Sequence, residues 1–397
     1  MDYQFIIAEK TPDCVSNPHA VDFLSDKERT IIARHTPKLR MNTRSDTMDK
    51  QEAPASFVHG NVDAPDRRQP LLEILDVRKH YPLHRGVFRS SKEMVKAVDG
   101  VTLTVHAHET LGLVGESGCG KTTLGYLILQ LTRLTSGRIL FEGKDVTHLS
   151  VKDETALRKD MQIIFQDPFS SLNPRLTIGS VLREVLSVHR IVPYVQLEEE
   201  VNRLLMLVGL DPSHRMRYPH EFSGGQRQRI VIARALALRP KFIVCDEAVS
   251  SLDISIQAQI LNLLRDLQDQ FGLTYLFISH NLNVVRHMAD RVAVMYVGKI
   301  VELCDYKSLY GNPKHPYTKA LLASNPVPDP THIVHRSILN GDVPSAAHLP
   351  MGCSFHPRCP EVFGDCAHIS PELASLDDGR LVRCLLFKSC YPHATNS

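Results

Sequence analysis

The glycine-rich stretch at residues 115–123 has the residue types and spacing that bind a polyphosphate. Its sequence is Gly-Glu-Ser-Gly-Cys-Gly-Lys-Thr-Thr, between an apolar run and a helical pattern expected over residues 121–131. Glycines let the backbone form a nest of N–H groups, and a helix start adds partial positive charge. An accidental glycine-rich turn would need every motif position and its context to be coincidental. The predicted nucleotide-binding residues here are Gly115, Glu116, Ser117, Gly118, Cys119, Gly120, Lys121, Thr122 and Thr123.

Side-chain chemistry in this stretch extends the prediction from phosphate to metal. We expect Lys121 to reach the β- and γ-phosphates of ATP and Thr122 to ligate Mg²⁺. Cys119 lies at the predicted helix start, where the helix dipole favours a thiolate. We therefore predict that Cys119 is alkylated rapidly and that ATP protects it.

Polar residues at the ends of two later apolar runs belong to the same predicted site. Residues 241–246 end in Asp246 and residues 276–280 end in His280, as expected of buried parallel strands. Ligands of α/β folds bind at the carboxyl ends of strands. We expect Asp246 to hold Mg²⁺ and Glu247 to activate the attacking water. A histidine at a strand end is more often structural than catalytic. The catalytic assignment of His280 therefore depends on the other polar residues at strand ends near the same phosphate site.

Tyr81 is a further candidate beside the nucleotide. It stands just before Pro82, where we expect the first strand to end. An aromatic ring at this place could stack on an adenine base. A surface tyrosine at a strand end is an equally good interpretation of the spacing.

Composition limits the class of protein. The chain has 397 residues, of which 43% are hydrophobic, enough for two domains or one large domain with appendages. A formal net charge of +2 gives no basic field, so nucleic acid is not an expected partner. No apolar run approaches the ~20 residues of a membrane helix, and the N-terminus lacks a secretion signal. We expect a cytosolic protein whose nine cysteines are thiols or metal ligands.

The order of patterns along the chain predicts three parts. Residues 1–70 are polar with scattered prolines and are expected to be a disordered extension, so that Met41 or Met48 could be the true start. Strands and helices alternate over residues 71–302, which predicts an α/β domain with a parallel sheet and a helical insert. Residues 303–397 are rich in proline and are expected to form a loop-rich extension.

Together these features resemble the ATP-binding cassette (ABC) family over roughly residues 71–302. Many enzymes have a phosphate loop, but Ser-Gly-Gly-Gln at residues 223–226, at a predicted helix start, follows it in this order only in ABC proteins. The resemblance implies an ABC-type P-loop nucleotide-binding domain with a β subdomain and a helical subdomain, the latter at about residues 168–235. It implies three catalytic residues: Gln166, which also contacts Mg²⁺, Glu247 as the catalytic carboxylate, and His280 as a switch. It adds these nucleotide-binding residues: Ser223, Gly224, Gly225, Gln226 and Asp253.

The finer resemblance is to the F-type ATP-binding subunits of oligopeptide and dipeptide importers. It depends on residues 165–168, 171–174, 221–229 and 315–317. It implies a second ABC ATPase subunit, paired head to tail so that each nucleotide lies between one phosphate loop and the other subunit's residues 223–226. It also implies two transmembrane permease subunits, an external substrate-binding protein and a peripheral place on the cytoplasmic face of the inner membrane.

Two departures and three alternatives accompany this resemblance. Ala248 stands where these subunits usually have proline, and Ser251 where they usually have alanine. The cargo is expected to be peptides, with nickel, glutathione or sugars as alternatives. An ABC ATPase outside transport usually has two cassettes or a coiled coil, and this sequence has one signature and no sustained heptads. A non-ABC phosphoryl-transfer enzyme is contradicted by the signature.

Four cysteines near the C-terminus carry a metal hypothesis. Cys353, Cys359, Cys366 and Cys384 are separated by five, six and seventeen residues. Zinc sites favour closer pairs, so spacing alone is typical of free thiols. Residues 352–359 resemble the C-terminal region of peptide-importer ATPases, some of which bind an iron-sulfur cluster. That resemblance implies a 4Fe-4S cluster on these four cysteines.

Overall fold

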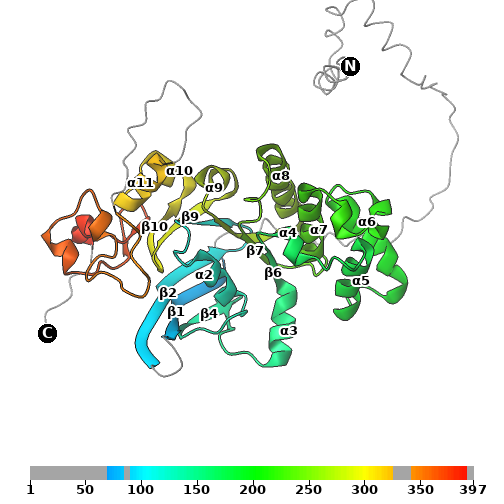
Figure 1. The fold of residues 1–397 in the computed structure, drawn as a ribbon, viewed down its shortest axis with the longest axis horizontal. Coiled ribbons are helices and arrows are strands. Elements are labelled where there is room, and N and C mark those ends of the chain that lie inside the picture. The colour runs from blue at the N-terminus through cyan, green and yellow to red at the C-terminus, as the bar shows by residue number, and fades with distance from the viewer. Residues whose placement is uncertain (1–68, 85–89, 325–340, 391–397) are drawn as a thin grey trace, which may run out of the picture. The chain divides into compact units, whose positions relative to one another are not determined.

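Alternating apolar runs and helical patterns fold into two sheets with helices around them (Figure 1). One hydrophobic core contains residues of both sheets. The computed structural model describes residues 69–84, 90–324 and 341–390. The predicted disordered extension, residues 1–70, therefore lies outside the described residues except for its last two positions. Among the residues that are described, no helix is both long and apolar enough to cross a membrane.

The larger sheet has eight strands in the order β11-β12-β10-β9-β3-β8-β7-β6. Strands β9, β3, β8, β7 and β6 are parallel to one another, whereas β10 pairs antiparallel with both β9 and β12, and β12 pairs antiparallel with β11. The α/β prediction with a parallel sheet is confirmed. The strands are β3 Thr110–Val114, β6 Met161–Ile164, β7 Phe242–Asp246, β8 Thr274–Ser279, β9 Arg291–Tyr296, β10 Lys299–Asp305, β11 Ala374–Ser375 and β12 Leu381–Val382.

The smaller sheet is antiparallel, with the order β2-β1-β4-β5. Its apolar side chains share one core with α2 and with the middle of the larger sheet, so the two sheets hold this helix on both sides. That packing fixes where the helix begins relative to both sheets. The strands are β1 Pro70–His84, β2 Ser90–His106, β4 Ser136–Phe141 and β5 Lys144–Asp145.

Strand β1 does not end at Tyr81 as predicted, but continues through Pro82 to His84. Its pairing with β4 ends at Arg78, and beyond that residue only β2 pairs with it within the described chain. Proline is tolerated where one side of a strand has no partner, because no ladder hydrogen bond is lost there.

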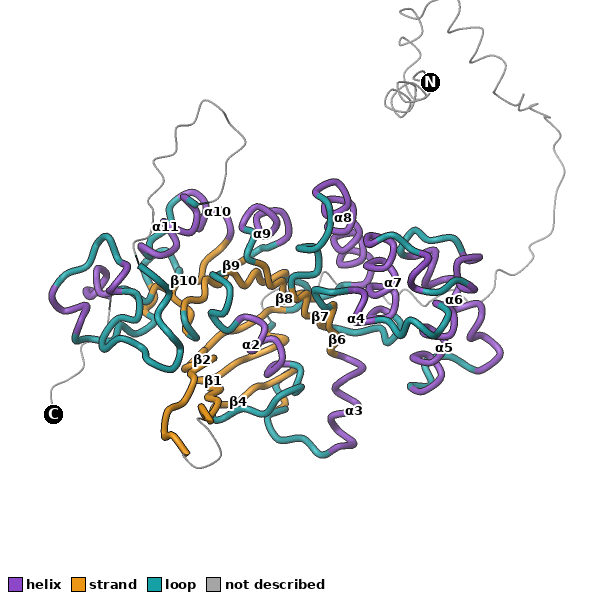
Figure 2. The backbone as a smooth tube through the Cα atoms, in the orientation of Figure 1, coloured by secondary structure: helices purple, strands orange, loops and turns teal. Residues whose placement is uncertain are grey.

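The helices follow the predicted patterns with one shortening. The helix expected over residues 121–131 ends at Ile128, and Gln130 has a left-handed backbone with φ 54°. Figure 2 shows the helices between the strands and the loops that dominate the end of the chain. They are α2 Lys121–Ile128, α3 Val151–Asp160, α4 Pro168–Ser171, α5 Ile178–Val188, α6 Leu197–Leu207, α7 Gly224–Leu236, α8 Ile254–Phe271, α9 Leu282–Met288, α10 Tyr306–Gly311 and α11 Pro316–Ala323.

The predicted helical insert corresponds to α5, α6 and α7, with 3-10 turns between them. Buried residues on α5 and α6 pack together, among them Leu182, Leu186, Val201, Leu204 and Leu205. This apolar spacing is the period-3.6 pattern seen in the sequence. The turns are Tyr194–Gln196, Pro212–Met216 and Pro219–Glu221.

The C-terminal extension is folded onto the cassette. The boundary predicted after residue 302 falls inside β10, and β12 pairs with this strand through Glu302↔Val382. The described residues of the cassette and of the extension accordingly belong to one unit. The regular structure at the end of the extension includes short 3-10 turns, as its proline-rich sequence predicts. They are His356–Arg358, Gly364–Ala367 and Leu385–Cys390.

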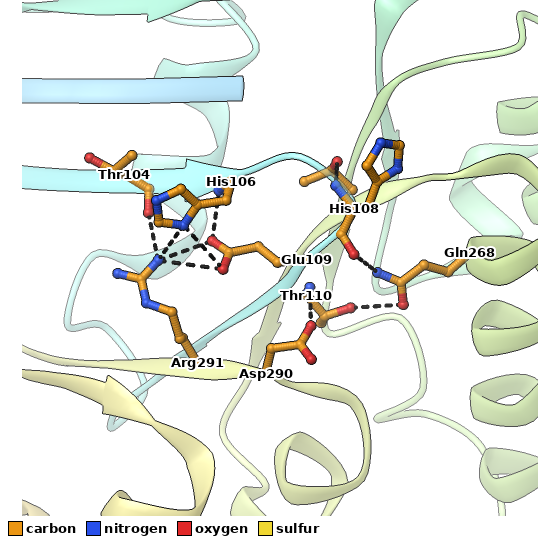
Figure 3. Close-up of polar contacts among 9 residues, drawn as sticks. Thr104, His106, His108, Glu109, Thr110, Gln268, Asp290 and Arg291 are labelled. Carbon is orange, nitrogen blue, oxygen red and sulfur yellow. Dashed lines mark hydrogen bonds and ion pairs between the residues drawn. The ribbon is translucent and has the colours of Figure 1, made fainter. Parts of the chain in front are cut away.

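A polar network fixes the start of β3, the strand that leads to the phosphate loop (Figure 3). The Arg291 guanidinium lies 3.1 Å from the buried Glu109 carboxylate. The Thr110 backbone N–H donates to the Asp290 carboxylate at 2.9 Å, and its hydroxyl donates to Gln268 at 3.1 Å. These bonds attach β3 at its amino end to β9 and α8, so its carboxyl end has a defined position.

Candidate active site

The phosphate loop joins β3 to α2 in a conformation that requires glycine. Gly115 has φ 156°, and a Cβ there would lie 2.2 Å from the Met295 carbonyl oxygen. Gly120 has φ 107°, and a Cβ there would lie 2.1 Å from the Ala97 carbonyl oxygen. Gly118 has open space around it but a left-handed φ of 78°. The predicted nest therefore has its steric basis in neighbouring backbone.

Lys121 points its ammonium at the loop. Its Nζ donates to the carbonyl oxygens of Gly115 at 2.8 Å and Glu116 at 2.9 Å, and the residue is 5% exposed. A cation held in this way is placed to meet phosphate oxygens. Exposed or half-buried positions are open to a ligand at Ser117, Gly118, Thr122 and Thr123.

Cys119 does not have the predicted reactivity. Only 2% of the residue is exposed, and burial raises the pKa of its thiol, although Lys121 acts in the opposite direction. The cost of burying a thiolate outweighs the lowering effect of Lys121 on this pKa. The prediction of an easily alkylated thiolate at this position is wrong.

Thr122 and Asp246 meet across the sheet end. The Thr122 hydroxyl donates to the Asp246 carboxylate at 3.1 Å, and Asp246 is buried. Burial raises the pKa of Asp246, and the neighbouring Glu247 carboxylate adds to the rise. A hydroxyl and a carboxylate fit Mg²⁺, which prefers oxygen ligands and takes others from water and phosphates.

Glu247 lies at the centre of the predicted catalytic group. Gln166 donates its amide N–H to one Glu247 oxygen at 3.1 Å, and His280 Nδ1 lies 3.2 Å from the other. Glu247 has a left-handed backbone with φ 49°, held by its N–H bond to the Ile278 carbonyl at 3.0 Å. Strained backbone at a sheet end is typical of functional sites. The structure thus brings all three predicted catalytic residues together.

The signature residues lie at the start of α7. Ser223 caps this helix, accepting from the Gln226 N–H at 3.3 Å, while its own N–H donates to Gln226 Oε1 at 3.1 Å. Gly225 is packed so closely that a Cβ would lie 2.5 Å from Ile256 Cγ2. Within the described residues, no hydrogen bond joins Ser223, Gly224 or Gln226 to the phosphate loop. The helix start is therefore open for another ligand.

Among the described residues, no hydrogen bond or ion pair joins Tyr81 or Asp253 to the phosphate loop or to Glu247. Tyr81 is 40% exposed on β1, with the Lys79 ammonium 4.7 Å from the centre of its ring. Asp253 precedes α8 and is exposed, and its side chain makes no cap bond. The roles of both residues in nucleotide binding stay predictions.

The four tail cysteines influence one another electrostatically. Burial raises the pKa of Cys359 and Cys384 to about 11, and the other cysteines of the set add to the rise. The Cys353 N–H also donates to the Cys366 carbonyl at 2.8 Å. Across the described ranges, however, no three or more His, Cys, Asp or Glu side chains are arranged to hold a metal ion. The arrangement as it stands does not fit the predicted 4Fe-4S cluster.

Sequence reasoning missed two residues that contact the phosphate loop. Arg358 and Tyr317, both in the C-terminal extension, bind Glu116. Both lie in strings, residues 315–317 and 352–359, that resemble the peptide-importer ATPases. They stand more than 200 residues from Glu116 in the chain, 242 for Arg358 and 201 for Tyr317, so the local sequence does not show that they contact it. The carboxylate and the backbone N–H of Glu116 therefore both bind the extension.

The comparisons with known families match this architecture. Residues 98–250 match the family model described as ABC transporter. Residues 301–366 match the family model described as oligopeptide/dipeptide transporter, C-terminal region. The second match begins inside β10, in agreement with the folding of the extension onto the cassette.

Solved structures share the cassette fold. The structure of cbiO1 from Clostridium perfringens has a TM-score of 0.53 and 25% identity, covering 61% of this chain and 91% of that one. The cassette MJ0796, in a dimeric post-hydrolysis state bound to ADP and Pi, has a TM-score of 0.52 and 26% identity, covering 59% and 98%.

Curated relatives match over most of the described chain. The oligopeptide transport ATP-binding protein AppF of Bacillus subtilis is 50% identical over 323 residues, which cover 81% of this chain and 98% of that protein. A probable peptide ABC transporter ATP-binding protein of Sinorhizobium fredii is 51% identical over 314 residues, covering 79% and 89%. The chain belongs to the ATP-binding subunits of ABC transporters of the oligopeptide/dipeptide type.

Proposed function

We propose that this chain hydrolyses ATP to drive the import of peptides through a membrane ABC transporter. The observation that carries the proposal is the contact of Glu247 with both Gln166 and His280, beside the Thr122–Asp246 pair. These groups stand at the carboxyl end of a parallel sheet, next to a phosphate loop. The names of the similar proteins supply peptides as the cargo.

The residues divide the chemistry among them. Lys121 and the loop N–H groups bind the phosphates of ATP, and Thr122, Asp246 and the Gln166 amide oxygen are the candidates to hold Mg²⁺. The ion would neutralise charge on the β- and γ-phosphates. Glu247 accepts a proton from the attacking water, and its contacts with Gln166 and His280 orient its two oxygens.

The signature supports a second ATPase subunit. Ser223 and the start of α7 offer N–H donors but make no hydrogen bond to this chain's own phosphate loop within the described residues. A γ-phosphate bound to the loop of one subunit can accept these donors from another subunit. MJ0796, which is dimeric with ADP and Pi, supports this arrangement. The proposed assembly includes a second ABC ATPase, two permease subunits and an external binding protein, on the cytoplasmic face of the inner membrane.

The 4Fe-4S cluster stays a separate proposal. Its support is the gathering of Cys353, Cys359, Cys366 and Cys384 in one electrostatically coupled group. The thiols would have to approach one another to bind iron, because within the described ranges no three of these side chains are arranged to hold a metal ion. No step of ATP hydrolysis depends on this cluster.

The test of the proposed function removes the acid group of Glu247. Glu247→Gln in the assembled transporter should bind ATP but lose roughly 10²-fold or more of its hydrolysis rate, because general-base catalysis contributes about that much. Uptake of a labelled peptide into proteoliposomes should stop with it. Glu199→Gln, an exposed residue on α6, is the matched control and should behave like the unchanged protein. Unchanged hydrolysis in Glu247→Gln would refute the catalytic assignment.

A further inference from the structure

The C-terminal extension binds the carboxylate and the backbone N–H of Glu116, the second residue of the phosphate loop. Arg358 Nη1 donates to Glu116 Oε2 at 2.8 Å and Nη2 donates to Oε1 at 3.0 Å. The Glu116 backbone N–H donates to the Tyr317 hydroxyl at 2.9 Å. Two parallel charge-assisted bonds fix both distance and orientation. Side chain and backbone of Glu116 are therefore both set by the extension.

An aromatic cluster fixes these two residues in turn. Tyr317 is fully buried on α11, with its ring 4.7 Å from that of Tyr296 and 5.5 Å from that of Phe355. Arg358 is 9% exposed, and its N–H donates to the Phe355 carbonyl at 3.0 Å. Rings packed in this way have few alternative rotamers. The Arg358 guanidinium is thus held beside the phosphate loop by a rigid part of the extension.

The position of Glu116 gives these contacts a meaning for ATP. Its carbonyl oxygen and that of Gly115 are the two acceptors that hold the Lys121 ammonium. A carboxylate in this loop also places negative charge beside a polyphosphate, and such repulsion is strong where water is partly excluded. Arg358 supplies the compensating positive charge, and the carboxylate in turn raises the pKa of that guanidinium.

We propose that Arg358 and Tyr317 are positioning residues of the nucleotide site, which set the phosphate loop and neutralise its carboxylate. The affinity of the ATPase for ATP then depends on the fold of its C-terminal extension. This inference rests on the proposed nucleotide site, but it assigns residues that neither the signature motifs nor the phosphate loop contains.

The experiment measures ATP binding and hydrolysis by the full chain with single substitutions. Arg358→Met should weaken ATP binding and raise KM by roughly tenfold, the size of a lost charge-assisted bond, while kcat at saturating ATP changes little. Added salt should narrow the difference in KM between Arg358→Met and the unchanged chain, because it screens the charge of the half-buried Glu116. Tyr317→Phe should weaken ATP binding by a smaller factor, about threefold, because it removes one neutral bond.

Two control substitutions match these variants. Lys319→Met removes an ion pair of 2.8 Å to Glu361 in the same extension without touching the loop. Tyr310→Phe removes a hydroxyl that donates to the Leu282 carbonyl, also away from the loop. Both should keep the unchanged KM. Thermal midpoints measured without nucleotide separate loss of folding from loss of ATP affinity.

Rescue variants decide between positioning and general structural support. Arg358→Lys keeps the charge and should recover part of the affinity, and Arg358→Glu with Glu116→Arg should bind ATP better than Arg358→Glu alone. Equal KM values for Arg358→Met and Lys319→Met would overturn the inference. So would a loss of ATP affinity across the variants that correlates with the thermal midpoint and does not depend on the charge at position 358. Lys121→Ala tests the proposed site itself: if it binds ATP normally, that site is wrong, whereas its failure beside a normal Arg358→Met refutes only the inference.

Discussion

At the scale of single residues, burial decides which groups of the phosphate loop are reactive. Cys119 and Lys121 are both buried, and two carbonyl oxygens of the loop stabilise the charge of Lys121. The thiol has a hydrogen-bond donor in Lys121 at 3.7 Å, but the cost of desolvation is larger and its pKa is raised. The sequence motif therefore identifies the side chain at each position, whereas burial and hydrogen bonds in the fold determine whether that side chain is charged.

Alkylation measures this directly. Because the pKa of Cys119 is raised, its thiolate is scarce at pH 8, and labelling should increase only as pH rises above the ordinary thiol range. Iodoacetamide should modify Cys119 at least about tenfold more slowly in the folded chain than in guanidinium, as mapped by peptide mass spectrometry. Rapid labelling of the folded chain near neutral pH would contradict the burial argument.

At the scale of elements, close packing of α7 on α8 explains the second glycine of the signature. Gly225→Ala would force its Cβ to 2.5 Å from Ile256 Cγ2, so we expect a destabilisation of about 1–3 kcal/mol, typical of overpacking. Gly224→Ala is the matched control, because its Cβ would meet Leu252 at an ordinary 3.4 Å. Thermal unfolding of both variants makes the comparison.

A smaller side chain at position 256 should remove the clash that Gly225→Ala creates, and this gives a second test of the packing. Ile256→Ala removes the methyl group that Gly225→Ala would strike, so the double variant should be more stable than the sum of the two single effects predicts. If the Gly225→Ala chain is as stable as the Gly224→Ala chain, α8 moves to accommodate the added methyl group without loss of unfolding free energy. The glycine would then serve access to the helix start and not packing.

Elements predicted from sequence were those whose signal is local. The apolar runs ending at Val114 and Asp246 are buried strands, and Ser223 caps the helix that its position predicts. The continuation of β1 past Pro82 depends on which neighbour strand is missing there, which no local pattern records. The contacts of Arg358 with the phosphate loop likewise depend on how the extension returns to the cassette.

At the scale of the whole molecule, the extension contributes to the site without containing any of its catalytic groups. It supplies Arg358 and Tyr317 to the loop and two strands to the larger sheet. Its four cysteines lie in the same segment as Arg358, which stands between Cys353 and Cys359. The state of those thiols is thus the feature of the extension to measure first.

Iron analysis tests that state. If the four cysteines bind a 4Fe-4S cluster, anaerobically purified chain should absorb broadly near ~400 nm and contain about four iron and four sulfide per chain. Cys359→Ser should lose most of the iron, whereas Cys304→Ser, a buried core position outside the set, should keep it. Colourless, iron-free protein would leave the four residues as ordinary thiols.

The pairing of the extension with β10 also has a consequence for synthesis on the ribosome. Strand β10 ends at Asp305, and its edge is covered by Leu381–Val382 and by the Arg383 N–H, which donates to the Val301 carbonyl. From 305 to 381 is 76 residues, so translation at about 5–20 residues per second leaves this edge open for roughly 4–15 s. An open edge with buried-type residues such as Ile300 and Leu303 can pair with another nascent chain. Residues 381–383, which are made after the cassette, therefore cover an edge that could otherwise pair between chains.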